Sequence, residues 1–309
     1  MNSEKITIAI PTFKRPQSLK GGLERLDELH NIDSRFGILV IDDSGSARFN
    51  NLNERVIDGF RNKTGLCVKY VVNDRNRGFP ETLIKLFENT ESEYMLLMSD
   101  DDLILARYFS EIVDFIFAHK PVLLAPQFLD GDRKHLTRGK KETRLIKPRE
   151  YRICCGHAPG LIFHVPSYRN QIKKIKSRIS RGCAATLTYP TVSFTFDLLL
   201  DGAEMYWYHK PLVMLGDDMP SGIKDQHGDH YSNMASRIQQ IAAFDLMVLE
   251  HEESQLRNEV LFETRAWSFK KALSAERHLK ELIVRETELS IILKCLFYKV
   301  KNRLRARSA

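Results

Sequence analysis

Short apolar runs alternate with helical patterns along the first third of the chain. Four runs have the mostly apolar or β-branched composition of strands that are covered on both faces: residues 5–10, 36–41, 66–72 and 94–98. Leucines recur at helical spacing within residues 16–30, and comparable patterns follow the second and third runs. Because parallel strands are joined by helical crossovers, this alternation predicts an α/β fold with a doubly wound, mostly parallel sheet.

After residue 126 the pattern becomes less regular. Residues 133–152 are rich in Lys and Arg and have almost no apolar periodicity, so we expect a basic excursion on the surface. Residues 167–181 carry six Lys or Arg and no acid, which predicts a basic helix. Two later apolar runs, 205–208 and 212–215, predict two short strands.

A further helix is expected to begin at Tyr189-Pro190-Thr191, because proline is favoured in the first helical turn. Ser193, Asp197 and Asp201 recur in it at a spacing of four residues. Polar residues at this spacing share one face of a helix, which predicts a solvated stripe.

From about residue 231 the pattern is helical to the end of the chain. We therefore expect a domain of residues 1–225 and a helical extension of residues 226–309. In residues 291–309 the apolar positions share one helical stripe, and six Lys or Arg are accompanied by no acid. A basic amphipathic helix of this kind binds an anionic membrane surface, where each basic residue contributes about 1 kcal/mol. The alternative is a terminal helix that packs on its own domain or on a partner subunit.

The composition suits a folded chain with an anionic partner. The 309 residues are 43% hydrophobic, and 47 Lys and Arg against 40 Asp and Glu give a formal net charge of +7. Five cysteines without zinc-finger spacing favour a reducing compartment. Because we find neither a signal peptide nor a membrane-spanning stretch, we expect a cytoplasmic protein, peripheral on the inner face of the cell membrane. We expect no nucleic-acid partner, because no stacking pattern or nucleic-acid motif accompanies the basic residues.

Polar clusters follow each of the four N-terminal strands. They are residues 11–15, Asp42-Asp43, residues 75–78 and Asp100-Asp101-Asp102. In such sheets the ligand lies beyond the carboxyl ends of the strands, so we expect these clusters to meet in one crevice. Three adjacent carboxylates repel one another in an apolar site, and a divalent metal would offset their charge. The alternative is that one Asp caps the next helix and the other two are solvated.

Four motifs, in this order, resemble those of the inverting family 2 glycosyltransferases, which have the GT-A fold. They are Ile-Pro-Thr-Phe-Lys-Arg (10–15), Val-Ile-Asp-Asp-Ser-Gly-Ser (40–46), Asn-Arg-Gly-Phe-Pro (76–80) and Leu-Met-Ser-Asp-Asp-Asp-Leu (97–103). The last stands at the place of the family's DXD motif. The resemblance is good over residues 5–125, fair to about residue 215 and absent beyond. The Tyr-Pro-Thr stretch (189–191) is most similar to the abequosyltransferase-like branch of O-antigen assembly.

The resemblance implies a nucleotide-sugar donor and Mg²⁺ or Mn²⁺. By similarity, residues from all four motifs would bind the nucleotide: Pro11, Thr12, Arg15, Asp42, Asp43, Arg75, Arg77 and Asp100. Asp100, Asp101 and Asp102 would hold the metal, which prefers hard oxygen ligands and would stabilise charge on the leaving nucleoside diphosphate. His157 and Gly160 would contact the sugar or the acceptor.

One departure from the family concerns the base that activates the acceptor hydroxyl. Many members carry a Glu-Asp pair where this chain has residues 189–191, and no carboxylate stands there. Asp197, two turns further on, and Asp218, in the loop after the last strand, are candidate catalytic bases. Asp217 and His157 are the other candidates. A general base must lie within hydrogen-bond reach of the acceptor oxygen, which is a matter of geometry.

Together these features predict a metal-dependent glycosyltransferase that moves a sugar from a nucleotide donor, with UDP favoured, to a lipid-linked or cell-surface glycan. An oligomer is compatible with the sequence. One alternative is a nucleotidyltransferase, which usually has a Gly-rich phosphate loop where this chain has Pro-Thr-Phe-Lys-Arg. The other is a non-catalytic nucleotide-sugar-binding subunit of a membrane complex, which would account for the missing Glu-Asp pair.

Overall fold

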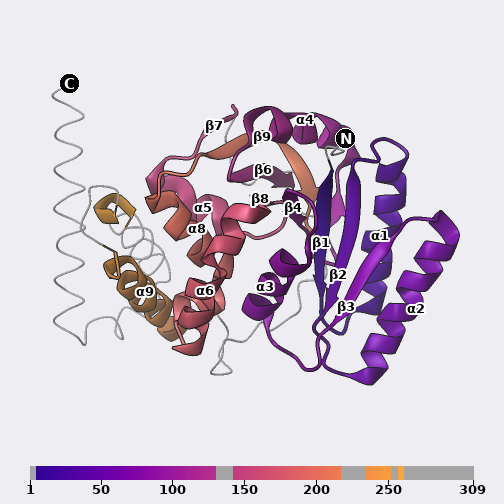
Figure 1. Cartoon of the computed structure of the whole chain (residues 1–309), viewed down its shortest axis with the longest axis horizontal. Coiled ribbons are helices and arrows are strands. Elements are labelled where there is room, and N and C mark those ends of the chain that lie inside the picture. Colours follow the sequence, from indigo (N-terminus) through magenta and orange to yellow (C-terminus); the bar gives the residue numbers. More distant parts are fainter. Residues whose placement is uncertain (1–4, 130–141, 217–233, 252–256, 261–309) are drawn as a thin grey trace. The chain divides into compact units, whose positions relative to one another are not determined.

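The computed structural model describes residues 5–129, 142–216, 234–251 and 257–260 (Figure 1). The chain divides into two compact units. The first consists of residues 1–182 and 189–221, and the second of residues 183–188 and 222–309. The sheet belongs to the first unit. The predicted boundary at residue 225 stays a prediction, because much of the extension lies outside the described residues.

One half of the sheet is parallel and consists of the four N-terminal strands. They are β1 (Ile6–Thr12), β2 (Phe36–Asp42), β3 (Val68–Val72) and β4 (Tyr94–Leu97). Their order across the sheet is β3-β2-β1-β4. Ile6 is paired with both Phe36 and Tyr94, so the neighbours of β1 start level with it and all carboxyl ends lie at one edge.

Helices cover both faces of this half, as right-handed crossovers require. α1 (Pro16–His30) and α2 (Ala47–Thr64) carry the chain from β1 to β2 and on to β3 in one direction, so both lie on the same face and pack together (Figure 1). α3 (Phe79–Asn89) takes the chain back to β4 and lies on the opposite face. The helix predicted over residues 16–30 is confirmed, and its leucines are buried: Leu19, Leu23, Leu26 and Leu29.

The second half of the sheet is mixed. β8 (Ile162–His164) runs antiparallel between β4 and β6 (Leu123–Leu129), and β6 pairs in parallel with β9 (Met205–Met214). The short strands β5 (Leu103–Ile104) and β7 (Arg144–Leu145) pair antiparallel with β9. The helices of this part are η1 (Ala106–Tyr108), α4 (Phe109–His119), η2 (Pro148–Glu150), α5 (Tyr151–Cys155), α6 (Val165–Ser180) and α8 (Pro190–Leu200).

Two strand predictions are wrong in their extent. β1 continues through Pro11 rather than ending before it. Its pairing with β4 stops at Ala9, so Pro11 has a neighbouring strand on one side only, where a proline is tolerated. Residues 205–214 form one strand instead of two, because a register shift at Gln127 of β6 accommodates Pro211 without ending the ladder.

The solvated stripe predicted on α8 is wrong for two of its three residues. Ser193 and Asp197 are 1% and 2% exposed. The Asp197 carboxylate pairs with Arg178 of α6, at 2.6 Å from Nη1 and 3.0 Å from Nη2, and with Lys174 Nζ at 2.6 Å. The basic helix that the sequence predicts packs against α8 and supplies the charges that allow a carboxylate to be buried there.

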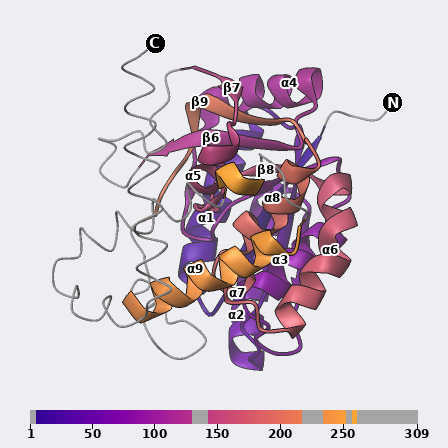
Figure 2. The ribbon, with the colours of Figure 1, turned by 90° about the vertical axis from the view of Figure 1, so that its left-hand side faces the viewer.

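Other basic side chains of α6 bind α3, which lies beside it in both views (Figure 1, Figure 2). The Arg169 guanidinium donates to the carbonyl of Phe87 at 2.9 Å and to that of Thr90, and so caps the end of α3. Lys176 pairs with Glu88 at 2.8 Å. α6 therefore fastens both α3 and α8 through its charged residues.

In the second unit the structure describes α7 (Ala184–Thr188) and α9 (Met234–Leu249), which pack against each other. No described helix is both long enough and apolar enough to cross a membrane. The predicted membrane-binding stretch, residues 291–309, lies outside the described residues, as do residues 217–233 after β9.

Replacing Arg178 with Met should strongly destabilise the protein, because it removes the buried partner of the Asp197 carboxylate. Breaking a buried ion pair from one side costs about 3–5 kcal/mol, of which Lys174 should offset a part. The matched control is Lys176→Met, which breaks an exposed pair with Glu88 and should cost less than about 1 kcal/mol. Urea denaturation at pH 7 measures both changes.

The stabilisation by Arg178 should fade in acid. Burial alone would raise the pKa of Asp197, but the hydrogen bonds and charges of Arg178 and Lys174 outweigh burial and hold the pKa below its usual range. The ionised carboxylate therefore stabilises the fold above the unfolded pKa of about 3.9, and this stabilisation is lost as the pH falls through the lower folded pKa. Equal free energies of unfolding for wild type and Arg178→Met at pH 7 would contradict this account.

Candidate functional site

The loop after β1 lies against the acidic triplet after β4. Thr12 Oγ1 donates a hydrogen bond to Asp100 Oδ2 at 2.7 Å, and Pro11 is half-buried beside it in β1. The Arg15 guanidinium pairs with Asp100 and, at 3.0 Å, with Asp101 Oδ2. Burial raises the pKa of Asp100 to about 6, against the opposing effects of the Thr12 hydrogen bond and the Arg15 charge. These donors offset a charge that would otherwise be costly to bury.

Asp102 faces the segment after β9 instead. Its Oδ2 accepts a hydrogen bond from the N–H of Ser99 at 3.2 Å, and its Oδ1 accepts one from the N–H of Gly216 at 3.2 Å. Burial raises the pKa of Asp102 to about 6, and repulsion from Asp101 adds to the increase. A cation near the carboxylates of Asp101 and Asp102 would therefore stabilise their charged forms.

Asp42, the last residue of β2, is fully buried. Its Oδ1 accepts a hydrogen bond from the N–H of Ser44 at 2.8 Å. Its Oδ2 accepts one from the side chain of Asn53 at 2.9 Å and one from the hydroxyl of Tyr70 at 2.7 Å. With no exposed surface, Asp42 supports the site from behind and is not placed to contact a nucleotide itself.

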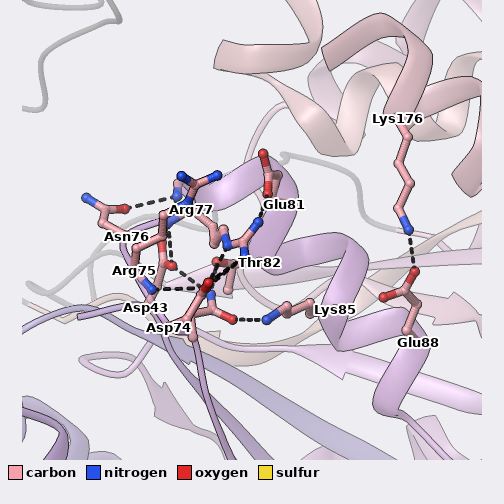
Figure 3. A network of polar contacts seen from close by, with 12 residues as sticks. Asp43, Asp74, Arg75, Asn76, Arg77, Glu81, Thr82, Lys85, Glu88 and Lys176 are labelled. Atoms are coloured by element: carbon pink, nitrogen blue, oxygen red, sulfur yellow. Dashed lines mark hydrogen bonds and ion pairs between the residues drawn. The ribbon is translucent and has the colours of Figure 1, made fainter. Parts of the chain in front are cut away.

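Asp43 joins the end of β2 to the loop between β3 and α3 (Figure 3). Its Oδ1 accepts hydrogen bonds from the N–H of Arg77 at 2.7 Å and from the side-chain amide of Asn73 at 2.6 Å. Its Oδ2 accepts one from the N–H of Gly78 at 2.8 Å. An ionised carboxylate has about four acceptor positions, so these three donors leave room for one more.

The two arginines of this loop are engaged differently. The Arg77 guanidinium pairs with Asp74 at 2.7 Å and with Glu81 at 3.4 Å (Figure 3). The Arg75 side chain is exposed and forms no ion pair with any of the described residues. Arg75 is therefore the better placed of the two to bind an anion.

Two glycines allow neighbouring loops to approach closely. Gly45 has a φ of +56°, and a Cβ on it would lie 2.4 Å from the backbone nitrogen of Asn76. A Cβ on Gly216 would lie 2.2 Å from the carbonyl oxygen of Asp101. The four polar clusters, together with the segment after β9, thus meet at the carboxyl edge of the parallel strands.

The carboxylates suit a divalent cation only in part. Among the described residues, no three His, Cys, Asp or Glu side chains are grouped so as to hold a metal ion by themselves. Of the three predicted ligands, Asp100 is fully buried and bound by both Thr12 and Arg15. Asp101 shares Arg15 with it, and Asp102 accepts two backbone N–H groups, so these two have more acceptor capacity left for a metal. Two carboxylates with hard oxygen donors and mutual repulsion fit Mg²⁺ or Mn²⁺ when a phosphate or water supplies the remaining ligands.

The predicted acceptor-side residues lie in the loop before β8. The His157 ring stacks on Phe128 of β6, with the ring centroids 4.3 Å apart. Gly160 has a φ of +79° and donates its N–H to the carbonyl of Leu97 at 2.8 Å. A Cβ on Gly160 would lie 2.9 Å from Val213 Cγ2, so the packing favours glycine. Contact of His157 or Gly160 with a sugar stays a prediction.

The structure does not support Asp197 as the catalytic base. Its two oxygens are engaged by Arg178 and Lys174, and these partners keep its pKa low. A buried carboxylate with a lowered pKa is a poor proton acceptor for a sugar hydroxyl. The other candidates in this region, Asp217 and Asp218, lie outside the described residues.

Sequence reasoning missed the side chains that hold the carboxylates. Asn73 binds Asp43, and Arg178 binds Asp197. Asn73 follows β3 directly, so the strand-end pattern that selected Asp43 could also have selected Asn73. Arg178 had no such signal, because its role depends on how α6 packs on α8.

Comparison with known families gives one match. The sequence model described as "Glycosyl transferase family 2" matches residues 7–175, more than half of the chain. No curated protein sequence matches the chain significantly.

Several solved structures share the fold. Residues 1–349 of TarS from S. aureus give a TM-score of 0.65 at 16% identity, over 94% of this chain and 79% of that one. The same TarS fragment in complex with UDP-GlcNAc gives 0.63 at 16% identity, over the same shares. The mannosyltransferase PcManGT from Pyrobaculum calidifontis, in complex with GDP-Man and Mn²⁺, gives 0.52 at 10% identity, over 98% and 82%. At such identities the likeness concerns the fold alone, and it confirms the predicted GT-A class.

Replacing Gly45 with Ala should destabilise the protein more than replacing Gly65 with Ala. Both glycines have positive φ, +56° and +73°, so both substitutions add backbone strain of about 1–2 kcal/mol. A Cβ on Gly65 meets nothing within 4 Å, whereas a Cβ on Gly45 collides with the backbone of Arg75 and Asn76. Thermal unfolding of the two variants measures the difference. A smaller loss for Gly45→Ala would contradict the close approach of the loops.

Proposed function

Since the chain belongs to glycosyl transferase family 2 and is a glycosyltransferase, we propose that it transfers a sugar, with inversion, from a UDP-sugar to a lipid-linked or cell-surface glycan. TarS and PcManGT were solved in complex with UDP-GlcNAc and GDP-Man, so a nucleotide-sugar donor agrees with structures of this fold. The family sets aside the nucleotidyltransferase alternative.

The observation that carries this proposal is the meeting of four strand ends at one edge of the sheet. Asp43 holds the loop after β3, and Thr12 and Arg15 hold the triplet after β4. The edge combines an exposed arginine, which suits phosphate oxygens, with carboxylates, which suit a divalent cation. A nucleoside diphosphate with Mg²⁺ or Mn²⁺ has both of these features.

In the proposed reaction the acceptor hydroxyl attacks the anomeric carbon while the bond from that carbon to the diphosphate breaks. Arg75 binds the departing diphosphate, and the remaining acceptor position of Asp43 receives an N–H or O–H of the nucleoside. Asp101 and Asp102 would hold the metal, which when bound would supply Lewis-acid stabilisation of the charge on the leaving group. The proton of the acceptor passes to a base, for which Asp217, Asp218 and His157 are the candidates.

Two finer proposals rest on the sequence. The Tyr-Pro-Thr stretch at residues 189–191 supports membership of the abequosyltransferase-like branch. The apolar stripe and unaccompanied basic residues of 291–309 support a peripheral position on the inner face of the cell membrane. In that arrangement a helical extension from about residue 226 brings the catalytic domain to a lipid-linked acceptor.

UDP binding should depend on Mn²⁺ and on Asp101. Replacing Asp101 with Ala removes an oxygen ligand, so the affinity for UDP with Mn²⁺ should fall at least about tenfold, while the affinity without Mn²⁺ should change little. Arg75→Ala should weaken UDP binding with and without metal. The matched control, Arg77→Ala, should weaken it less, because Asp74 and Glu81 already engage Arg77. Calorimetric titration with UDP, and with GDP for comparison, measures these affinities.

UDP binding that needs no metal and is unchanged by Asp101→Ala would contradict the proposed metal site. A second measurement, of donor hydrolysis or of transfer to a crude lipid acceptor, distinguishes an enzyme from a non-catalytic binding subunit. A protein that binds UDP-sugars and never cleaves them would instead be the binding subunit.

Removing residues 287–309 should release the protein from anionic liposomes, because the truncation deletes the basic amphipathic stretch. Flotation with vesicles that contain phosphatidylglycerol measures the bound fraction, and neutral vesicles serve as the control. High salt should weaken binding of the full chain. Unchanged flotation after truncation would assign this stretch to packing within the protein.

A further inference from the structure

A chain of hydrogen bonds links α3 to the carboxylate of Asp43, directly after β2 (Figure 3). We call this chain, Lys85–Asn73–Asp43, the relay. Lys85 Nζ, on the second turn of α3, donates a hydrogen bond to Asn73 Oδ1 at 2.6 Å. Asn73 is fully buried, and its Nδ2 donates to Asp43 Oδ1 at 2.6 Å and to Thr82 Oγ1 at 3.3 Å. Asp43 in turn accepts the two N–H groups that shape the loop before α3.

Lys85 fixes which way the amide of Asn73 points. A carboxylate can only accept hydrogen bonds and an ammonium can only donate them, so Asn73 must turn its oxygen to Lys85 and its nitrogen to Asp43. Thr82 does not impose this orientation, because a hydroxyl can donate as well as accept. Without Lys85, the amide could turn its oxygen toward Asp43, where two acceptors would repel.

The orientation of Asn73 affects the loop that follows β3. Asp43 receives three donors, and loss of one would free the carboxylate to rotate away from the N–H groups of Arg77 and Gly78. Gly78 has a φ of +79° and is the N-cap of α3, the helix on which Lys85 lies. The loop leads into α3, Lys85 of α3 binds Asn73, and Asn73 binds Asp43, which accepts the N–H groups of the loop. A change at Lys85 can therefore reach the loop through these hydrogen bonds.

We propose that Lys85 is a positioning residue for the nucleotide pocket, acting through Asn73 on Asp43 and on the loop that presents Arg75. This inference rests on the proposed use of a nucleotide sugar. Lys85 does not touch the donor; it keeps Asp43 and the loop in the conformation that binds it. Pre-organisation of this kind raises affinity by removing the cost of ordering the site when the ligand binds.

A merely structural lysine would behave differently. Lys176 provides the comparison, because it pairs with Glu88 of the same helix but lies apart from the relay (Figure 3). If Lys85 only fastened α3, its loss would lower the melting temperature and leave the affinity of the folded protein intact. If it positions Asp43, the loss appears in donor affinity even where the protein is fully folded.

The test compares Lys85→Met, Lys85→Arg and the control Lys176→Met in the full chain. UDP and GDP binding with Mn²⁺ is measured by calorimetry, donor hydrolysis gives KM and kcat, and thermal unfolding shows the folded fraction. We expect Lys85→Met to weaken UDP binding about ten- to a hundredfold, as loss of a charged hydrogen bond does, and to raise KM more than it lowers kcat. Lys85→Arg should restore most of the affinity, and Lys176→Met should bind as wild type does.

A double-mutant cycle shows whether Lys85 acts through Asn73. The effect of Lys85→Met on UDP affinity should shrink at least about threefold in an Asn73→Ser background, where the amide is absent. Additive effects, or a folded Lys85→Met protein with wild-type affinity, would overturn the inference and leave the proposed function standing. If Lys85→Met does not fold, Lys85→Gln takes its place with the same expected direction, because its amide can accept as well as donate and so no longer fixes the orientation of Asn73. Wild-type protein that binds neither nucleotide would overturn the proposed function and this role of Lys85 with it.

Discussion

The carboxylate of Asp43 accepts three hydrogen bonds from the segment between β3 and α3, and the arrangement of the whole site depends on it. Backbone N–H groups that are removed from water need acceptors, and those of Arg77 and Gly78 find theirs on a different strand. The side chain of Asn73 supplies the third donor. The conformation of the loop thus depends on the carboxylate of Asp43, a residue that is 6% exposed. The same carboxylate has one acceptor position left, which a ligand could fill. Asp43 thus combines an observed structural role with the proposed binding role, and the binding role would require rigid surroundings.

The three adjacent aspartates illustrate how one loop can place equal side chains in unequal environments. Asp100 is fully buried against the end of β1, where Thr12 and Arg15 compensate its charge. Asp102 is held by two backbone N–H groups, and Asp101 keeps partial exposure beside Arg15. Arg15 thus supplies part of the positive charge that the triplet requires. The proposed divalent cation would have to balance only the remainder, so two carboxylates and a diphosphate would be a sufficient ligand set.

The parallel half of the sheet could be predicted from the sequence because its signals are local. Apolar runs and leucine spacing depend on neighbouring residues, and the helix over residues 16–30 was placed at its observed bounds. The meeting of the polar clusters then follows from parallel topology alone. The short strands of the mixed half could not be predicted, because strands of two or three residues such as β5, β7 and β8 exist only through partners far along the chain. The same limit applies to Asp197, whose burial depends on Arg178 and Lys174 from another helix and not on its own spacing.

The contacts of α6 change what the net positive charge implies. The sequence shows a helix with six basic residues and no acid, which by itself would suit an anionic surface. In the structure Lys174 and Arg178 balance Asp197, Lys176 balances Glu88, and Arg169 binds carbonyls at the end of α3. Most of the positive charge of α6 is therefore paired within the first unit and is not available to a partner. The anionic partners of the proposed function would therefore be bound elsewhere: a diphosphate by exposed residues such as Arg75, and a membrane by basic residues outside α6. This distribution of charge agrees with the proposal that the crevice binds the diphosphate and the C-terminal stretch binds the membrane.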